Sequence, residues 1–213
     1  MHQYHKIHSV FKREPDGKRK IIEGEYSRPE FKYLKNNIWD WTEKVDGTNI
    51  RVIFQDGNFT FKGKTDNAML PAPLVQKLND IFLPQAALCS EMFRRSDDLE
   101  TTVCFYGEGY GPKIQSGGKY RKDQSFVLFD IWINGWWLER DSIESIASQL
   151  GIKIVPIIRA GTLNSMIEFV RNGFKSEWGD FEAEGVVARP CVELRARSGE
   201  RVITKLKCRD FGR

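Results

Sequence analysis

Residues 39–62 read WDWTEKVDGTNIRVIFQDGNFTFK. Polar and apolar residues alternate on both sides of the central Asp-Gly pair, and aromatic and β-branched residues are frequent, as is typical of strands. The pattern predicts antiparallel strands over Trp39–Glu43, Asn49–Gln55 and Phe59–Lys62. A second Asp-Gly pair, at residues 56–57, predicts the tight turn before the last strand. We therefore expect the sheet structure to begin early in the chain.

Other segments follow the same two periodicities. A Pro-Asp-Gly turn predicts a hairpin between Tyr4 and Ile22, and helical spacing predicts helices that end at a glycine or are broken by Pro84. The expected strands are 103–107, 125–133, 185–189 and 201–207, and the expected helices are 74–82, 86–95, 142–150 and 163–172. Without an internal repeat or linker, this order predicts one α+β domain over residues 1–213, with mainly antiparallel sheets flanked by helices.

The composition limits the classes of protein. The chain has 213 residues, 40% of them hydrophobic, and a net charge of +4, which suits a polyanionic partner without establishing one. No apolar run is long enough to span a membrane, and the amino terminus lacks a secretory signal pattern, so we expect a cytoplasmic protein with no membrane partner. Four scattered cysteines argue against zinc and disulfides. His2, His5 and His8 would alternate in a strand, which argues against a metal site there.

Lys44 is the first candidate for chemistry, because it precedes the tight Asp46-Gly47 turn. The alternative is a simple hairpin turn with a solvated lysine. Lys205 and Lys207 alternate on a predicted strand and so share one face, where two ammonium groups could bind a phosphate. The alternative for them is an ordinary polar face. Glu184, at the start of an apolar strand, could hold Mg²⁺ on a phosphate oxygen.

Two further segments could contribute to a nucleotide site. Glu108 stands between two glycines at the end of a predicted strand, where a ligand can approach the backbone and a carboxylate can accept a ribose hydroxyl. Phe129 is either a shelf for a purine or part of the core, and the sequence does not separate these alternatives.

The order of these motifs along one chain is more specific than any one of them. Lysine-x-aspartate-glycine, glycine-glutamate, aromatic-aspartate, glutamate-glycine and lysine-x-lysine follow one another between residues 44 and 207. The chain thereby resembles the covalent nucleotidyltransferase superfamily of polynucleotide ligases and capping enzymes, with an ATP-grasp-like ligase fold. It is most similar to the ATP-dependent RNA ligases, in particular those of phages that seal nicks, because Asn49 stands where DNA ligases and capping enzymes usually have arginine.

The resemblance implies a role for each matched residue. Lys44 would attack the α-phosphate of ATP and form a lysyl-adenylate, with Mg²⁺, or alternatively Mn²⁺, held by Glu184. Lys205 and Lys207 would bind the α-phosphate, and Asn49 would bind phosphate in the later steps that join a 5′-phosphate to a 3′-hydroxyl of RNA. The other contacts with the nucleotide would come from Glu43 at the adenine, Val187 and Phe129 around the purine, and Glu108 at the ribose.

The chain departs from the family pattern in two places. Lys64 stands where an arginine is common, which removes a planar bidentate donor. Only six residues follow Lys207, so we expect a catalytic domain alone, without an OB-fold or a carboxyl-terminal helical domain. RNA, as a nicked duplex or a broken structured RNA, would then be held by a protein partner or by a basic loop. The basic side chains of this loop could meet phosphates and its tyrosines could stack on bases; the loop residues are Tyr110, Lys113, Lys119, Tyr120, Arg121 and Lys122. The alternative for this loop is a solvated, flexible segment.

Three competing functions fit parts of the pattern. A minimal ATP-dependent DNA ligase would share the chemistry and differ in the polynucleotide. A capping enzyme would use GTP, and a non-catalytic nucleic-acid-binding relic would have lost motif residues, all of which are present here.

Overall fold

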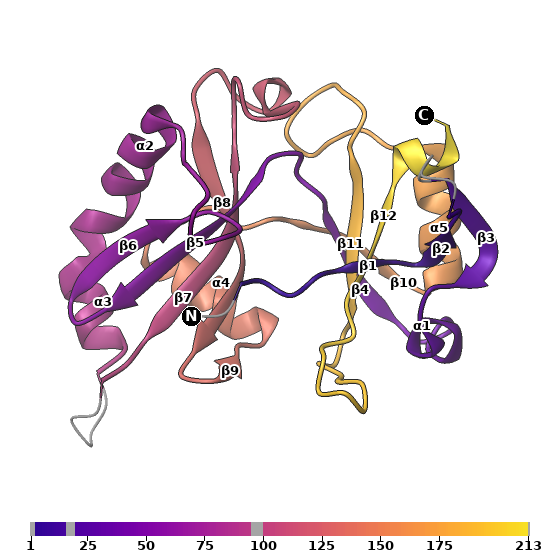
Figure 1. Cartoon of the computed structure of the whole chain (residues 1–213), viewed down its shortest axis with the longest axis horizontal. Coiled ribbons are helices and arrows are strands. Elements are labelled where there is room, and N and C mark those ends of the chain that lie inside the picture. The colour runs from indigo at the N-terminus through magenta and orange to yellow at the C-terminus, as the bar shows by residue number, and fades with distance from the viewer. Residues whose placement is uncertain (1–2, 16–19, 95–99, 213) are drawn as a thin grey trace. The chain divides into compact units, whose positions relative to one another are not determined.

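The computed structural model describes residues 3–15, 20–94 and 100–212 (Figure 1). The chain divides into two compact units, the first formed by residues 1–4 and 46–155 and the second by residues 5–45 and 156–213. Each unit contains one five-stranded sheet with helices packed on it. The predicted α+β class with mainly antiparallel sheets is therefore confirmed.

The sheet of the first unit is antiparallel throughout, with strand order β6-β5-β7-β8-β9. Its strands are β5 (Thr48–Gln55), β6 (Asn58–Lys62), β7 (Val103–Tyr110), β8 (Ser125–Ile133) and β9 (Trp136–Trp137). Its helices are α2 (Ala72–Phe82), η1 (Leu83–Gln85), α3 (Ala86–Met92), η2 (Gly117–Lys119) and α4 (Arg140–Gln149). Leu78 and Phe82 of α2 and Ile143 of α4 pack against Phe105 and Phe126 in the main core of this unit.

The opposite face of this sheet has a smaller apolar cluster. Ile53, Cys104 and Tyr106 form it, with Tyr4 and Phe129 packed against them. Because side chains alternate along a strand, this is the same face that presents Asn49, Arg51 and Glu108. Asn49, Glu108 and Phe129 therefore lie on the sheet face that α2 does not cover.

The sheet of the second unit has the order β1-β12-β11-β4-β10, parallel between β1 and β12 and antiparallel elsewhere. Its strands are β1 (His8–Ser9), β4 (Trp39–Glu43), β10 (Ile157–Gly161), β11 (Gly185–Pro190) and β12 (Thr204–Lys207). A separate hairpin consists of β2 (Phe11–Arg13) and β3 (Ile21–Tyr26), and the helices are α1 (Pro29–Tyr33), α5 (Leu163–Asn172) and η3 (Cys208–Phe211).

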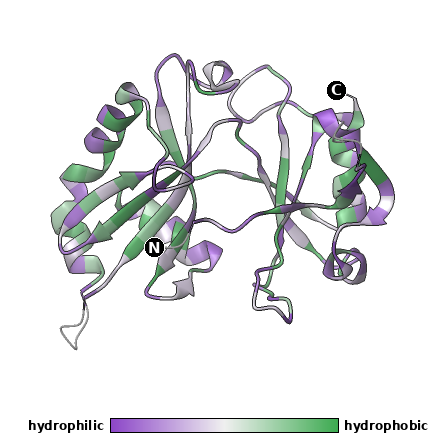
Figure 2. Cartoon of the chain, viewed as in Figure 1, coloured by the Kyte–Doolittle hydropathy of each residue, from purple (hydrophilic) through white to green (hydrophobic). Residues whose placement is uncertain are grey.

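Helix α5 covers one face of this second sheet. Thr162 caps the helix by accepting a hydrogen bond from the Ser165 N–H at 3.1 Å, and Gly173 at φ 70° ends it. Met166 and Val170 pack with Trp41 in the core. Figure 2 shows both hydrophobic and hydrophilic residues on α5, as expected of a helix with one buried side.

Most predicted elements are confirmed, including the hairpin near the amino terminus, the break at Pro84 and the strand pair β11 and β12. The turn residues 16–19 of the hairpin and Arg95 lie outside the described residues. The alternative of a simple hairpin turn at Asp46-Gly47 is wrong, because β4 and β5 belong to different sheets. Elements α1, β9 and β10 were not predicted. Within the described residues, no helix is both long and apolar enough to cross a membrane.

Candidate functional site

The second unit brings three lysines to one face of its sheet. Lys44 directly follows β4, and its N–H donates to the Gly185 carbonyl at 2.9 Å. Gly185 pairs with Lys207 in the neighbouring strand, and Val187 pairs with Lys205. We call Lys44, Lys205 and Lys207 the lysine cluster. The prediction that Lys205 and Lys207 share a face is confirmed by this register.

Glu184 is the carboxylate at the centre of this cluster. Its Oε2 atom lies 2.6 Å from Lys44 Nζ, and its Oε1 atom accepts a hydrogen bond from Lys207 Nζ. The Glu184 side chain is only 11% exposed, so these contacts are partly shielded from water. Gly185 makes the arrangement possible, because a Cβ atom there would lie 2.1 Å from the Leu206 carbonyl oxygen.

The charged form of Lys205 is disfavoured by its position in the cluster. Burial, followed by the charges of Lys44 and Lys207, lowers the pKa of Lys205 from 10.5 to about 8. Glu184 opposes this shift without cancelling it. Three ammonium groups around one carboxylate leave an excess of positive charge, which is the environment that favours a bound anion.

Glu43 lies on the other face of the sheet from Lys44. Its side chain, 1% exposed, accepts hydrogen bonds from Ser176 Oγ at 2.6 Å and from the Glu177 N–H at 2.8 Å. Burial raises the pKa of Glu43, and the Ser176 hydrogen bond partly offsets the rise. Glu43 thus anchors the segment that leads to Glu184, and its predicted contact with adenine stays a prediction. Val187 lies on the lysine face, where its carbonyl accepts from Thr42 Oγ1 at 3.2 Å.

In the first unit, Asn49 and Glu108 are direct partners across β5 and β7. The nearby turn requires glycine, because a Cβ atom on Gly47 would lie 2.3 Å from the Gly109 carbonyl oxygen and 2.8 Å from Glu108 Cγ. The Asn49 side-chain oxygen is buried and has no hydrogen-bond partner. This pair could therefore contact a polar ligand, as the sequence predicted.

Phe129 packs against Tyr4 on the same sheet face. Their ring centroids are 5.0 Å apart in an edge-to-face arrangement, and Tyr4 also donates to Asp130 Oδ2 at 2.7 Å. Phe129 is only half-buried, so both the core role and the purine contact remain open for it.

Lys64 lies exposed in the segment that follows β6. Beneath it, the fully buried Arg51 donates from Nε to the Gly63 carbonyl at 2.9 Å and from Nη2 to Asp66 Oδ1 at 2.9 Å. The Arg51 hydrogen bond, with help from Lys62, lowers the pKa of Asp66. Arg51 thus holds the segment that carries Lys64, the position where the family commonly has an arginine.

The basic loop differs from its predicted form. Lys113, Lys119 and Lys122 are exposed, but Tyr110 and Tyr120 are buried, so the expectation that these tyrosines stack on bases is wrong. The loop is also tied to the segment after Lys44. The Asp46 N–H donates to the Tyr120 hydroxyl at 3.1 Å, and the Ser116 N–H donates to Asp46 Oδ2 at 3.2 Å. This anchoring argues against a wholly flexible loop.

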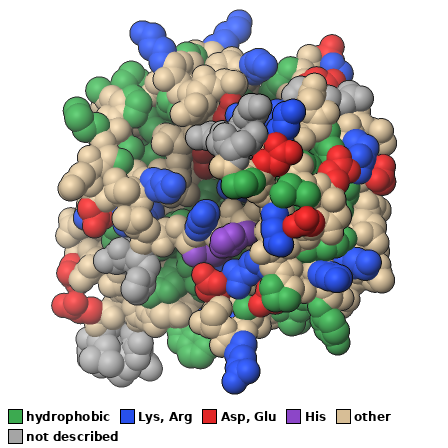
Figure 3. Space-filling model, turned by 45° about the vertical axis from the view of Figure 1, so that its right-hand side comes forward, with side chains coloured by type: hydrophobic (Ala, Val, Ile, Leu, Met, Phe, Trp, Pro, Cys, Tyr) green, Lys and Arg blue, Asp and Glu red, His purple; other side chains and the backbone are tan. Residues whose placement is uncertain are grey.

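His8 lies in β1, next to the strand that carries Lys205, because Ser9 of β1 pairs with Lys205 of β12. Figure 3 shows histidine side chains beside lysine and arginine, and burial followed by the Arg28 and Lys6 charges lowers the pKa of His8. His2 lies outside the described residues.

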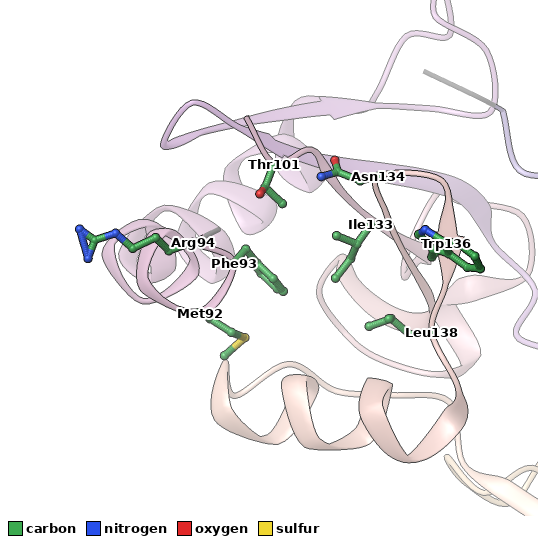
Figure 4. Close-up of a pocket in the computed structure, with 8 residues that line it drawn as sticks. All are labelled: Met92, Phe93, Arg94, Thr101, Ile133, Asn134, Trp136 and Leu138. Carbon is green, nitrogen blue, oxygen red and sulfur yellow. The ribbon is translucent and has the colours of Figure 1, made fainter. Parts of the chain in front are cut away.

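A cavity of about 380 Å³ opens between α3 and the β8–β9 turn (Figure 4). It is lined by Met92, Phe93, Arg94, Thr101, Ile133, Asn134, Trp136 and Leu138, none of them a predicted site residue.

Sequence reasoning missed the residues that support the site. Ser176 and Glu177 bind Glu43 from more than 130 positions away, and Arg51 reads as an ordinary polar strand residue. The available signal was the alternation along β4: Glu43 follows Trp39 and Trp41 at every second position, so its side chain points to the same buried face.

Comparison with known proteins agrees with the motif order. The family model for RNA ligase matches residues 38–207. Among solved structures, a variant of the Naegleria gruberi RNA ligase with ATP and Mn matches with a TM-score of 0.65 and 19% identity, over 84% of this chain and 51% of that one. The same ligase with PPi matches with a TM-score of 0.65 and 20% identity, over 84% of this chain and 52% of that one. The chain thus spans about half the length of the solved structures that it matches. Since the family model covers most of the chain and all five motifs, the protein belongs to the RNA ligase family.

Proposed function

We propose that the protein is an ATP-dependent RNA ligase that joins 3′-hydroxyl and 5′-phosphate ends through a lysyl-adenylate on Lys44. The observation that carries the proposal is the lysine cluster around Glu184, with Lys44 and Lys207 ion-paired to its two oxygens. Such a cluster combines a nucleophilic amine with fixed positive charges for a phosphate.

In the first step, Lys44 Nζ separates from Glu184, releases a proton to water and attacks the α-phosphorus of ATP as a neutral amine. The N–P bond forms as the bond from the α-phosphorus to the pyrophosphate oxygen breaks, and pyrophosphate departs. Lys205 and Lys207 bind the α-phosphate oxygens and stabilise the charge that spreads over them during transfer. Since β12 fixes the backbone of both lysines, their side chains start from defined points on the same face of the sheet before ATP arrives.

Glu184 is the residue that fits a divalent cation. Among the described residues no group of three or more His, Cys, Asp or Glu forms a protein cage for a metal. Mg²⁺ typically needs only one or two carboxylates besides water and substrate phosphates, so a single buried carboxylate suits it. Glu184 would hold the Mg²⁺ or Mn²⁺ ion, which would neutralise phosphate charge.

The adenylate then passes from Lys44 to the 5′-phosphate of an RNA end, breaking the N–P bond and forming a pyrophosphate link. The 3′-hydroxyl of the other end attacks this activated phosphate, AMP departs, and a phosphodiester remains. We assign Asn49 to phosphate binding in these steps, and Glu108 and Phe129 to the ribose and the purine. Lys64 would take the place of the usual arginine.

We propose further that residues 1–213 act as a single catalytic domain of a cytoplasmic ligase. Its RNA substrate, a nicked duplex or a broken structured RNA, would be held by the exposed lysines of the basic loop. The anchoring of this loop to Asp46 supports the assignment, because it holds those lysines at a defined place in the first unit. A protein partner would make further contacts with the RNA.

The first test is incubation with α-labelled ATP and Mg²⁺, followed by denaturing electrophoresis. Protein freed of preformed adenylate by pyrophosphate should become labelled, Lys44→Ala should not, and Lys12→Gln, a surface lysine change, should label normally. No label on the native chain with ATP would refute the proposal, and label with GTP alone would point to a capping enzyme. Sealing of nicks with 3′-ribose or 3′-deoxyribose ends then distinguishes an RNA ligase from a DNA ligase.

A further inference from the structure

An ion pair with a buried carboxylate lies just beyond the carboxyl end of β12, in residues outside the range that the family model matches. Arg13 of β2 donates from Nη2 to both carboxylate oxygens of Asp210 in η3, at 3.0 and 3.1 Å. The Arg13 Nη1 atom lies 3.0 Å from the same carboxylate. The Asp210 side chain is only 3% exposed, so the pair is shielded on the acidic side. Bidentate arginine–carboxylate contacts of this kind fix geometry as well as charge.

Asp210 uses the same carboxylate to hold the backbone of Lys207. Its Oδ2 atom accepts a hydrogen bond from the Lys207 N–H at 3.1 Å. The next N–H, of Cys208, donates to the Glu184 carbonyl at 2.9 Å. The backbone at Lys207 is therefore fixed to the strand that follows Glu184 and, through Asp210, to Arg13.

The position of this backbone matters because a lysine side chain is a flexible four-carbon stem. The ammonium group of Lys207 can meet the Glu184 carboxylate, and later a phosphate, only if the stem starts from a defined point. Arg13 is also close enough for its charge to contribute to the lowered pKa of Lys205. Both observations connect the first hairpin with the lysine cluster.

Resting on the proposed function, we infer that Arg13 and Asp210 are positioning residues for Lys207 in phosphoryl transfer. They hold the Lys207 backbone so that its ammonium group meets the α-phosphate as the transfer proceeds. Phosphoryl transfer depends mainly on positioning and fixed charge, and small displacements of such a group cost rate rather than nucleotide binding. A pair that only fastened the carboxyl-terminal turn to the hairpin would instead affect stability and leave the rate unchanged.

The experiment measures lysyl-adenylate formation in a single turnover over a range of ATP concentrations. Arg13→Gln and Asp210→Asn should each lower the rate at saturating ATP by about tenfold, with a change in half-saturating ATP below about threefold. Arg13→Lys, which keeps the charge but not the fork, should recover part of the rate. The matched control is Lys12→Gln, which removes an exposed pair with Glu25 (3.2 Å) from the same strand and should have no effect.

Combination with Lys207→Met decides whether the effect passes through Lys207. If it does, Arg13→Gln should cause no further loss of rate in the Lys207→Met background, measured over longer times. A native rate at saturating ATP in folded Arg13→Gln protein, or an equal loss in both backgrounds, would overturn the inference. Should Arg13→Gln fail to fold, Arg13→Lys and Asp210→Asn provide the same comparison. Failure of the native chain to form any adenylate would instead refute the proposed function.

Discussion

Replacement of Lys205 by methionine should make the protein more stable and abolish its chemistry. Lys205 has a folded-state pKa of about 8 against 10.5 for an ordinary lysine, so its charged form is disfavoured in the folded protein. Methionine keeps the length and the apolar stem of the side chain but brings no charge next to Lys44 and Lys207. The variant thus removes the effect of the Lys205 charge on the free energy of unfolding while keeping most of the apolar contacts of the side chain.

The size of the effect follows from the pKa shift. A fall from 10.5 to about 8 corresponds to about 3 kcal/mol, since each pKa unit is worth about 1.4 kcal/mol. Lys205 is only partly buried, and solvent screening reduces such terms, so we expect a gain of about 1–2 kcal/mol for Lys205→Met at pH 7. The cost is fully present below pH 8, where both folded and unfolded chains carry the charge. It disappears as pH rises from about 8 to 10.5, where the folded protein binds fewer protons than the unfolded chain.

Urea unfolding of adenylate-free protein at pH 7 and at pH 10 tests this reasoning. Lys205→Met should be more stable than the native chain at pH 7, and the difference should shrink at pH 10. Thr204→Ser, a conservative change at the adjacent buried position, controls for general effects on β12. A loss of stability at pH 7, or a difference that does not change with pH, would refute the electrostatic account.

Three further outcomes can be measured directly. Lys205→Arg should keep the rate of adenylate formation above pH 8, where the native rate falls as Lys205 loses its proton; parallel declines would contradict this. Ser176→Ala should lower the free energy of unfolding by about 1.5–3 kcal/mol, because buried Glu43 loses a donor, and a urea midpoint equal to that of the native chain would exclude this role. Charge reversal at Lys119 and Arg121 should weaken RNA sealing more than adenylate formation, and equal losses would remove the loop from RNA binding.

The sequence predicted the local elements well because local patterns determine them. Alternation and Asp-Gly turns located β5 and β6, and the spacing of Lys205 and Lys207 placed both on one face. It could not reveal that β4 joins a different sheet from β5, because the partners of β4 are β10 and β11, more than 100 residues later. The choice of sheet partner depends on long-range pairing that no local periodicity contains.

The same limit applies to the candidate site. The motif residues were found because they follow one another in a family order, but the hydrogen bonds that Glu43 accepts from Ser176 and Glu177 were not predicted. Alternation alone would have placed Glu43 and Lys44 on opposite faces, since neighbouring residues in a strand point in opposite directions. The sequence did not reveal that Ser176 and the Glu177 N–H donate to Glu43, which allows its carboxylate to be buried.

The lysine cluster links the stability of the protein to its proposed chemistry. A buried site that held three ammonium groups without enough negative charge would ordinarily be replaced by apolar residues, because packing alone is more favourable. Glu184 offsets part of the repulsion, yet the pKa of Lys205 is still lowered, so the ligand-free site lacks negative charge. An anion that enters this site supplies the missing negative charge. The repulsion among the ammonium groups, which destabilises the ligand-free protein, is then relieved, and this relief strengthens binding of the anion. A triphosphate is an anion of this kind, and transfer of its α-phosphate to Lys44 removes one of the three positive charges.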